Sequence, residues 1–136
     1  MRIKKRARIS YGSVGDIAPR KLGDLRMRAI AGAAGLNITF LHEELPPDGA
    51  APTVVHSATA EFVYMLAGSV TGLVSGKKIE LKQGDYLMIP PGVAHKFTAG
   101  SGGGEAISVF SPPMDPAKPD AKIIPDENNT RNRRKS

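Results

Sequence analysis

Short runs of alternating apolar and polar residues recur along the chain and predict β-strands. Residues 36–45 alternate, contain β-branched and aromatic side chains, and stop at the turn sequence Pro46-Pro47-Asp48-Gly49, so they predict a strand and a turn. The same pattern predicts further strands at 53–56, 61–66, 69–74, 78–81, 86–89, 95–98 and 106–110. Short strands at such even spacing are typical of a sandwich or barrel, so the expected fold class is all-β.

Turn-forming residues separate these predicted strands. Ser75-Gly76 predicts a hairpin turn, and residues 82–85 predict the next one. The glycine-rich residues 101–104 predict a flexible connection. Ser111-Pro112-Pro113 cannot continue a central strand, because proline lacks the backbone donor, so the folded body is expected to end near Pro113.

Three segments follow from this pattern. Residues 1–35 have poor periodicity and several turn signals, and we expect one or two short edge strands there. Residues 36–113 form the predicted body of strands. Residues 114–136 are dominated by Pro, Lys, Asp, Asn and Arg, with only Ile123 and Ile124 able to dock, so we expect an extended or disordered tail.

The composition fits one compact domain of 136 residues, of which 40% are hydrophobic and 24% charged. The absence of cysteine excludes disulfides and thiolate metal sites. The longest nearly apolar stretch, residues 29–36, is far shorter than the roughly 20 residues of a membrane span. No apolar segment of a secretory signal follows the basic first residues, so we expect a cytoplasmic protein without membrane association.

The formal net charge of +6 comes from the two ends of the chain. Residues 2–8 carry five basic side chains and residues 131–135 carry four, whereas all 13 acidic residues lie between these segments. Readers of nucleic acid place positive charge on a folded face rather than at chain ends. Nucleic acid is therefore an unlikely partner.

Two of the three histidines lie near residues that suggest metal chemistry. His56 precedes Glu61 by five residues, and His95 ends the sequence Pro90-Pro91-Gly92-Val93-Ala94-His95. Imidazole and carboxylate are the ligands that borderline divalent metals take when thiolate is absent. Two histidines and a glutamate at the ends of neighbouring predicted strands favour a metal site.

The second of these histidines closes a regularly spaced set of turn residues. Gly84, Pro90, Gly92 and His95 stand at the spacing G-x5-P-x-G-x2-H. This spacing resembles the second motif of the cupin superfamily, whose usual closing Asn is replaced by Ala99.

Residues 49–68 resemble the first cupin motif. His56, Glu61 and Gly68 fit its H-x4-E-x6-G half, and the 15 residues between the two motifs match the short spacing of small single-domain cupins. The resemblance implies a jelly-roll β-barrel, also called a double-stranded β-helix, with a metal held inside by a His-x-His pair, a Glu and the second-motif His. Val54 occupies the place of the first histidine.

Two interpretations of the three remaining ligands stay open. His56, Glu61 and His95 hold one divalent transition metal (Fe, Mn, Ni or Zn) and leave positions free for water, substrate or oxygen. In the other interpretation the cupin is degenerate, and the three side chains only hydrogen-bond across the barrel. If Glu61 points into the barrel, alternation places Val63 and Met65 inside and Phe62 and Tyr64 outside.

His42, on the strand before the first motif, is the candidate catalytic residue. A histidine titrates near pH 6.5 and suits proton transfer if it reaches the pocket. The alternative is a partly exposed strand histidine with no chemical role.

The resemblance predicts a protein that acts on a small organic molecule. Small cupins include dioxygenases, isomerases, lyases and decarboxylases, and the fold does not choose among them. A hypothesis from another class is a non-enzymatic binding or sensing module, in which Val54 marks a lost catalytic metal. Small cupins are commonly dimers whose N-terminal strand joins the partner's sheet, so residues 1–35 predict a homodimer.

Overall fold

The computed structural model describes residues 9–30, 33–115 and 118–125, and within these residues it contains nine β-strands, two short 3-10 helices and no α-helix. The helices are η1 (Val14–Asp16) and η2 (Ala33–Leu36). The strands are β1 (Arg20–Leu22), β2 (Leu25–Ala29), β3 (Thr39–Leu45), β4 (Thr53–His56), β5 (Ala60–Val74), β6 (Lys77–Lys82), β7 (Tyr86–Ile89), β8 (His95–Ser111) and β9 (Ala121–Ile124). No described helix has the length and apolar character that crossing a membrane requires.

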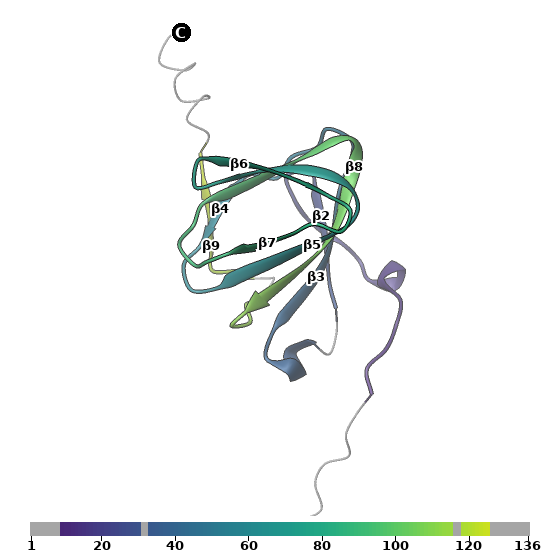
Figure 1. Ribbon diagram of the computed structural model, residues 1–136. Coiled ribbons are helices and arrows are strands. Elements are labelled where there is room, and N and C mark those ends of the chain that lie inside the picture. Colours follow the sequence, from purple (N-terminus) through teal and green to yellow (C-terminus); the bar gives the residue numbers. More distant parts are fainter. Residues whose placement is uncertain (1–8, 31–32, 116–117, 126–136) are drawn as a thin grey trace, which may run out of the picture.

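The strands form one antiparallel sheet that curls into a jelly-roll barrel (Figure 1). Their order is β1-β2-β3-β8-β4-β9, and β5 pairs with β6, β7 and β8. The first part of β5 pairs with β7 and its second part with β6, so this one strand contributes to both sides of the barrel. The all-β prediction is confirmed, and β4 and β7 have the predicted bounds.

Strands β5 and β8 are each continuous where the sequence predicts two shorter strands. The expectation of a flexible connection at 101–104 was wrong, because these residues belong to β8. Gly68 (φ 69°) lies so close to β8 that an added Cβ would fall 2.1 Å from the carbonyl oxygen of Gly103. The pairing also shifts register beside Gly68, which is typical of a β-bulge. The glycines therefore let two backbones approach closely at a bend of the barrel.

The two ends of the chain add strands to the barrel. β1 and β2 form a hairpin whose second strand pairs with β3 of the same chain, in the region where short edge strands are expected. β9 pairs with β4 over four residues, so part of the tail expected to lie outside the folded body joins the sheet. The basic runs at 2–8 and 131–135 lie outside the described residues, and the homodimer stays a prediction.

The barrel interior is apolar along β5. Val63 and Met65 are buried, as the alternation from Glu61 predicts, while Phe62 and Tyr64 point outward and are 40% and 43% exposed. The main core cluster packs side chains from β3, β5, β6 and β8, and consists of Leu45, Met65, Val70, Leu81 and Ala99. This core fills part of the interior and leaves a cavity beside it.

Candidate metal centre

A cavity of about 280 Å³ lies inside the barrel, and its walls are mostly apolar. Strands β3, β5 and β8 supply Leu41, Val63 and Phe110, and the hairpin β1–β2 supplies Leu22 and Leu25. His56, Glu61 and His95 also line it, although each of them is at least 94% buried. Apolar walls around a few converging polar groups are typical of a site for a small organic molecule.

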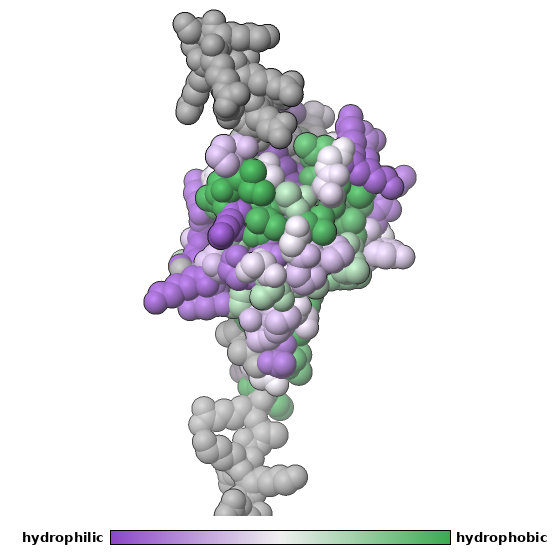
Figure 2. All heavy atoms as spheres, turned by 90° about the vertical axis from the view of Figure 1, so that its left-hand side faces the viewer, coloured by the Kyte–Doolittle hydropathy of each residue, from purple (hydrophilic) through white to green (hydrophobic). Residues whose placement is uncertain are grey.

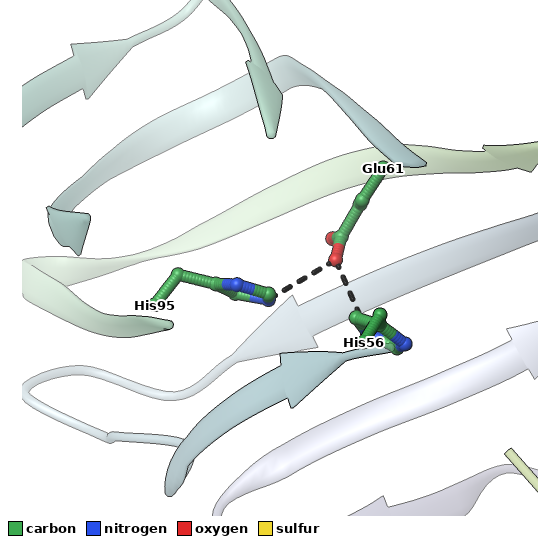
Figure 3. A group of neighbouring side chains, drawn as sticks. All are labelled: His56, Glu61 and His95. Atoms are coloured by element: carbon green, nitrogen blue, oxygen red, sulfur yellow. Dashed lines mark ion pairs between the residues drawn. The ribbon is translucent and has the colours of Figure 1, made fainter. Parts of the chain in front are cut away.

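The three predicted ligands meet at one point of this cavity (Figure 3). His56 ends β4, Glu61 lies at the start of β5, and His95 begins β8. Oε1 of Glu61 lies 3.6 Å from Nε2 of His56 and 3.3 Å from Nε2 of His95. One ligand atom from each residue lies within 4.8 Å of the others, so one ion can contact all three.

The hydrogen bonds of Nδ1 in His56 and His95 determine which ring nitrogen of each histidine faces Glu61. Nδ1 of His95 lies 3.0 Å from the carbonyl oxygen of Val93, and Nδ1 of His56 lies 3.0 Å from Oδ1 of Asp120. A carbonyl and a carboxylate only accept hydrogen bonds, so each Nδ1 carries the hydrogen and donates. In a neutral ring, Nε2 then points a lone pair at Glu61, as metal-binding histidines do.

This arrangement suits either a proton or a metal ion between the three residues. Two lone pairs facing a carboxylate oxygen repel it unless a proton or a metal ion lies between them. Burial opposes a charged ring at His95, but the hydrogen bond and negative charge of Glu61, with the Val93 carbonyl, outweigh it and raise the pKa of His95. The donor set of two imidazoles and one carboxylate therefore fits a divalent transition metal.

Asp120 also holds the loop after β4. Its Oδ2 accepts the backbone N–H of Ala58 at 2.8 Å. Burial would raise the pKa of Asp120, but the Ala58 N–H, the contact with His56 and the Thr59 side chain lower it below its usual value. Asp120 is therefore an anionic acceptor beside His56.

Val54 occupies the place of a fourth ligand without supplying a donor atom. It lies two residues before His56 on the same buried face of β4 and lines the cavity. In the sheet it pairs directly with His95. The centre therefore offers three protein ligands, which leaves other positions on a bound ion open.

A second carboxylic acid, Glu43 on β3, faces the same cavity. Oγ of Ser108 contacts Oε1 of Glu43 and lies 3.1 Å from Oε2 of Glu61. The single hydroxyl hydrogen of Ser108 can be donated to only one of the two carboxylates. An additional proton on Glu43 lets both hydrogen bonds of Ser108 form. Burial, followed by the negative charge of Glu61, raises the pKa of Glu43 to about 8 although the Ser108 hydrogen bond lowers it. Glu43 is thus a carboxylic acid linked to the centre, and in the metal-free protein its pKa of about 8 favours the protonated form at neutral pH.

The raised pKa of Glu43 makes the stability of the metal-free protein depend on pH. Between the ordinary value of 4.5 and about 8 the folded state holds a proton that the unfolded state has lost, so stability falls as pH rises through this window. Glu43→Gln removes this pH-dependent loss of stability, and we expect it to raise the melting temperature by about 10 °C more at pH 8 than at pH 5. Thermal unfolding of the chelator-treated protein checks this expectation.

Glu80→Gln, on the exposed surface of β6, is the matched control and should leave the pH dependence unchanged. If Glu43→Gln shifts the melting temperature equally at both pH values, Glu43 is already ionised in the folded protein.

His42 lies away from the three ligands. Leu41, Glu43 and Leu45 line the cavity, and the alternation of β3 points the His42 side chain to the opposite face. Its Nε2 lies 2.6 Å from Oε2 of Glu105, and its buried Nδ1 has no hydrogen-bond partner among the residues that the structure describes. The catalytic role of His42 stays a prediction, but Glu43 is the titratable group of β3 that reaches the cavity.

Comparison with protein families matches residues 41–110 to the family described as Cupin domain. This segment is more than half of the chain and contains both motifs and all three ligands. The chain is a cupin. The resemblance predicted from the two motifs is therefore confirmed.

Individual proteins resemble this chain in sequence or in fold at low sequence identity. Germin-like protein subfamily 3 member 1 of Arabidopsis thaliana is 30% identical over 86 residues, which are 59% of this chain and 41% of that protein. A predicted oxalate decarboxylase from Thermotoga maritima has a TM-score of 0.67 at 20% identity and covers 74% of this chain and 97% of its own. The polyketide cyclase RemF from Streptomyces resistomycificus has a TM-score of 0.71 at 18% identity, covering 95% and 94%.

Sequence reasoning missed two residues of this cupin centre, Glu43 and Asp120. A signal for Glu43 existed, because it lies between Leu41 and Leu45 on one face of an alternating strand. Its neighbour Glu44 points to the other face of the strand, where it pairs with Arg28. Asp120 lies in a polar segment that carried no comparable signal.

Proposed function

We propose that this cupin is a metal-dependent enzyme that catalyses proton transfer on a small organic molecule in the barrel cavity. His56, Glu61 and His95 would hold one divalent metal ion. A bound divalent metal supplies a Lewis acid that polarises a carbonyl or carboxylate oxygen. The observation that carries the proposal is the position of Glu43, which lines the same cavity as the three ligands and is joined to Glu61 through Ser108.

Glu43 and Ser108 provide the acid–base part of this chemistry. Glu43 holds a proton where a substrate in the cavity can reach it, and Ser108 keeps its carboxyl group in place. An acid whose pKa lies near the working pH both gives and takes a proton efficiently. This supports isomerase, lyase or decarboxylase chemistry over a reaction that needs no acid.

The apolar walls limit the substrate to a small molecule with a largely apolar body. Leu41, Val63 and Phe110 cannot hydrogen-bond, so recognition of polar groups falls to the polar residues of the lining: the metal centre, Glu43 and the cationic residues Arg20 and Lys21. A carbonyl or carboxylate group at the metal end suits both. We therefore propose small keto and carboxylic acids as the substrate class.

The proposal predicts metal uptake and metal-dependent proton exchange. Untagged protein, stripped with chelator and reloaded with Fe(II), Mn(II), Ni(II) or Zn(II), should bind about one equivalent per chain, as catalytic sites with three protein ligands do. In D2O, the loaded protein should speed deuterium incorporation next to the carbonyl group of compounds from a panel of small keto acids. Metal analysis and proton NMR measure both on the same samples.

Glu43→Gln is the informative variant because it keeps the shape of the side chain and removes the acid. It should retain the metal and lose the exchange. Protein that refuses all four metals contradicts the proposal.

A second candidate function is metal-free binding of a small molecule, and the replacement of a ligand by Val54 favours it. In that case a compound from the panel raises the melting temperature of metal-free protein without any proton exchange, because binding to the native state alone stabilises it.

A further inference from the structure

The segment after β8 contributes its described residues, 112–115 and 118–125, to the wall of the cavity and to the sheet of the barrel. At its start, the Thr39 hydroxyl donates to the carbonyl oxygen of Met114 at 2.6 Å and accepts the N–H of Met114 at 2.9 Å. At its end, β9 runs beside β4, with Ala121 opposite His56 and Ile124 opposite Thr53 (Figure 1). Met114, Pro119 and Ala121 line the cavity, so this segment is part of its wall.

Asp120 connects this segment to the candidate metal centre. Its two oxygens contact Nδ1 of His56 at 3.0 Å and the N–H of Ala58 at 2.8 Å. His95 is held differently, because its Nδ1 donates to the carbonyl oxygen of Val93 in the preceding loop. One imidazole is therefore oriented by its own loop, and the other by a carboxylate 64 residues further along the chain.

Apolar burial contributes little to the docking of β9. Ile123 and Ile124 are 61% and 38% exposed. Figure 2, which views the molecule from the left-hand side of Figure 1, shows apolar side chains gathered on that face. The backbone pairing with β4 and the contacts of Asp120 hold the strand in place. A contact with His56 therefore makes up an appreciable part of what fixes this segment.

We propose that Asp120 is a positioning residue of the metal centre, and that docking of β9 and binding of a divalent metal at His56, Glu61 and His95 stabilise each other. The inference rests on the proposed metal site but not on the reaction. Asp120 holds the hydrogen of His56 on Nδ1 and turns the ring so that Nε2 faces the centre. Carboxylates that orient ligand histidines in this way raise metal affinity about 10- to 100-fold.

The coupling between metal and strand is reciprocal. If docked β9 raises the affinity for metal by a given factor, bound metal favours docked β9 by the same factor. The amide groups of β9 should therefore exchange hydrogen more slowly after metal is added. The same reasoning predicts that, in a variant that does not bind metal, adding metal does not slow the hydrogen exchange of the β9 amide groups.

Asp120→Ala tests the proposal in the full chain, with Lys122→Ala as the matched control on the exposed face of β9. We expect Asp120→Ala to weaken Zn(II) binding by about 10- to 100-fold in competition titrations, and Lys122→Ala to leave it unchanged. Asp120→Asn retains an acceptor oxygen and should recover part of the lost affinity. Equal losses in Asp120→Ala and Lys122→Ala, or no loss in either, overturn the proposal.

The tautomer of His56 gives a readout that a merely structural role would not change. Nitrogen NMR should show hydrogen on Nδ1 of His56 in wild type and a mixture of tautomers in Asp120→Ala. This measurement also works on metal-free protein. Wild type that binds none of Fe(II), Mn(II), Ni(II) and Zn(II) overturns the proposed function and the metal coupling, and the His56 signal then decides separately whether Asp120 positions the ring.

Discussion

Replacing His95 with alanine is expected to weaken the binding of divalent metal by about 1000-fold, equivalent to about 4 kcal/mol. His95 is 3% exposed, and its Nε2 lies 3.3 Å from Oε1 of Glu61. Its removal leaves one imidazole and one carboxylate, which is fewer than the three protein ligands of a typical catalytic site. Titration with Zn(II) against a chelating indicator measures the loss.

Thermal unfolding provides an independent measurement of the same effect. A ligand that binds only the folded state at 100 times its dissociation constant stabilises it by about 2.7 kcal/mol, so Zn(II) should raise the melting temperature of wild type. It should not do so for His95→Ala. His95→Gln, which fills more of the vacated space, separates loss of the ligand from loss of packing.

His42→Ala is the matched control because it removes the third histidine of the chain, which is also buried but pairs with Glu105 outside the cavity. It should lower stability without lowering the affinity for metal. If His42→Ala and His95→Ala weaken metal binding equally, the metal does not bind at the three converging residues.

Val54→His is expected to tighten metal binding on the order of 100-fold, or about 2.7 kcal/mol, by adding a fourth protein ligand. Val54 shares the buried face of β4 with His56 and is paired with His95 across the sheet. A histidine there has its ring in the cavity, where the volume of about 280 Å³ accommodates it. Competition titrations with Zn(II) and Ni(II) on wild type and variant check the gain.

Val55→His is the control for Val54→His. Val55 is the next residue of β4, and the alternation of the strand points it to the opposite face. It adds the same side chain without placing it in the cavity, so the affinity at the centre should not change. A gain of equal size in both variants points to adventitious binding by the added imidazole, and an unchanged affinity in Val54→His shows that the vacant ligand position is out of reach.

The two variants also address why a cupin would retain only three ligands. A fourth protein ligand occupies a position that a substrate oxygen could otherwise take. We therefore expect Val54→His to lower any proton-exchange activity while it raises metal affinity. Higher metal affinity together with lower activity would connect Val54 to the proposed function. A metal site that served stability alone would only become more stable with the added histidine.

Much of the barrel can be predicted from local sequence pattern. The bounds of β4 and β7 follow from alternation and from the turn residues on either side of each strand, which act over a few positions. The inward orientation of Glu61 and Val63 follows from the period of two in a strand. The pattern fails at 101–104, because a run of glycines has the same composition in a flexible loop and at a close approach of two backbones.

From the sequence alone come the all-β class, the cupin motifs and the three residues whose ligand atoms converge, because each depends on spacing within one or two neighbouring strands. The tertiary structure alone decided that Glu43 meets Glu61 through Ser108 and that Asp120 reaches His56. Ser108 is 65 residues from Glu43 and 47 from Glu61, and Asp120 is 64 residues from His56. Contacts over such separations depend on the order and register in which strands pair, and a one-residue shift would turn these side chains to the other face of the sheet.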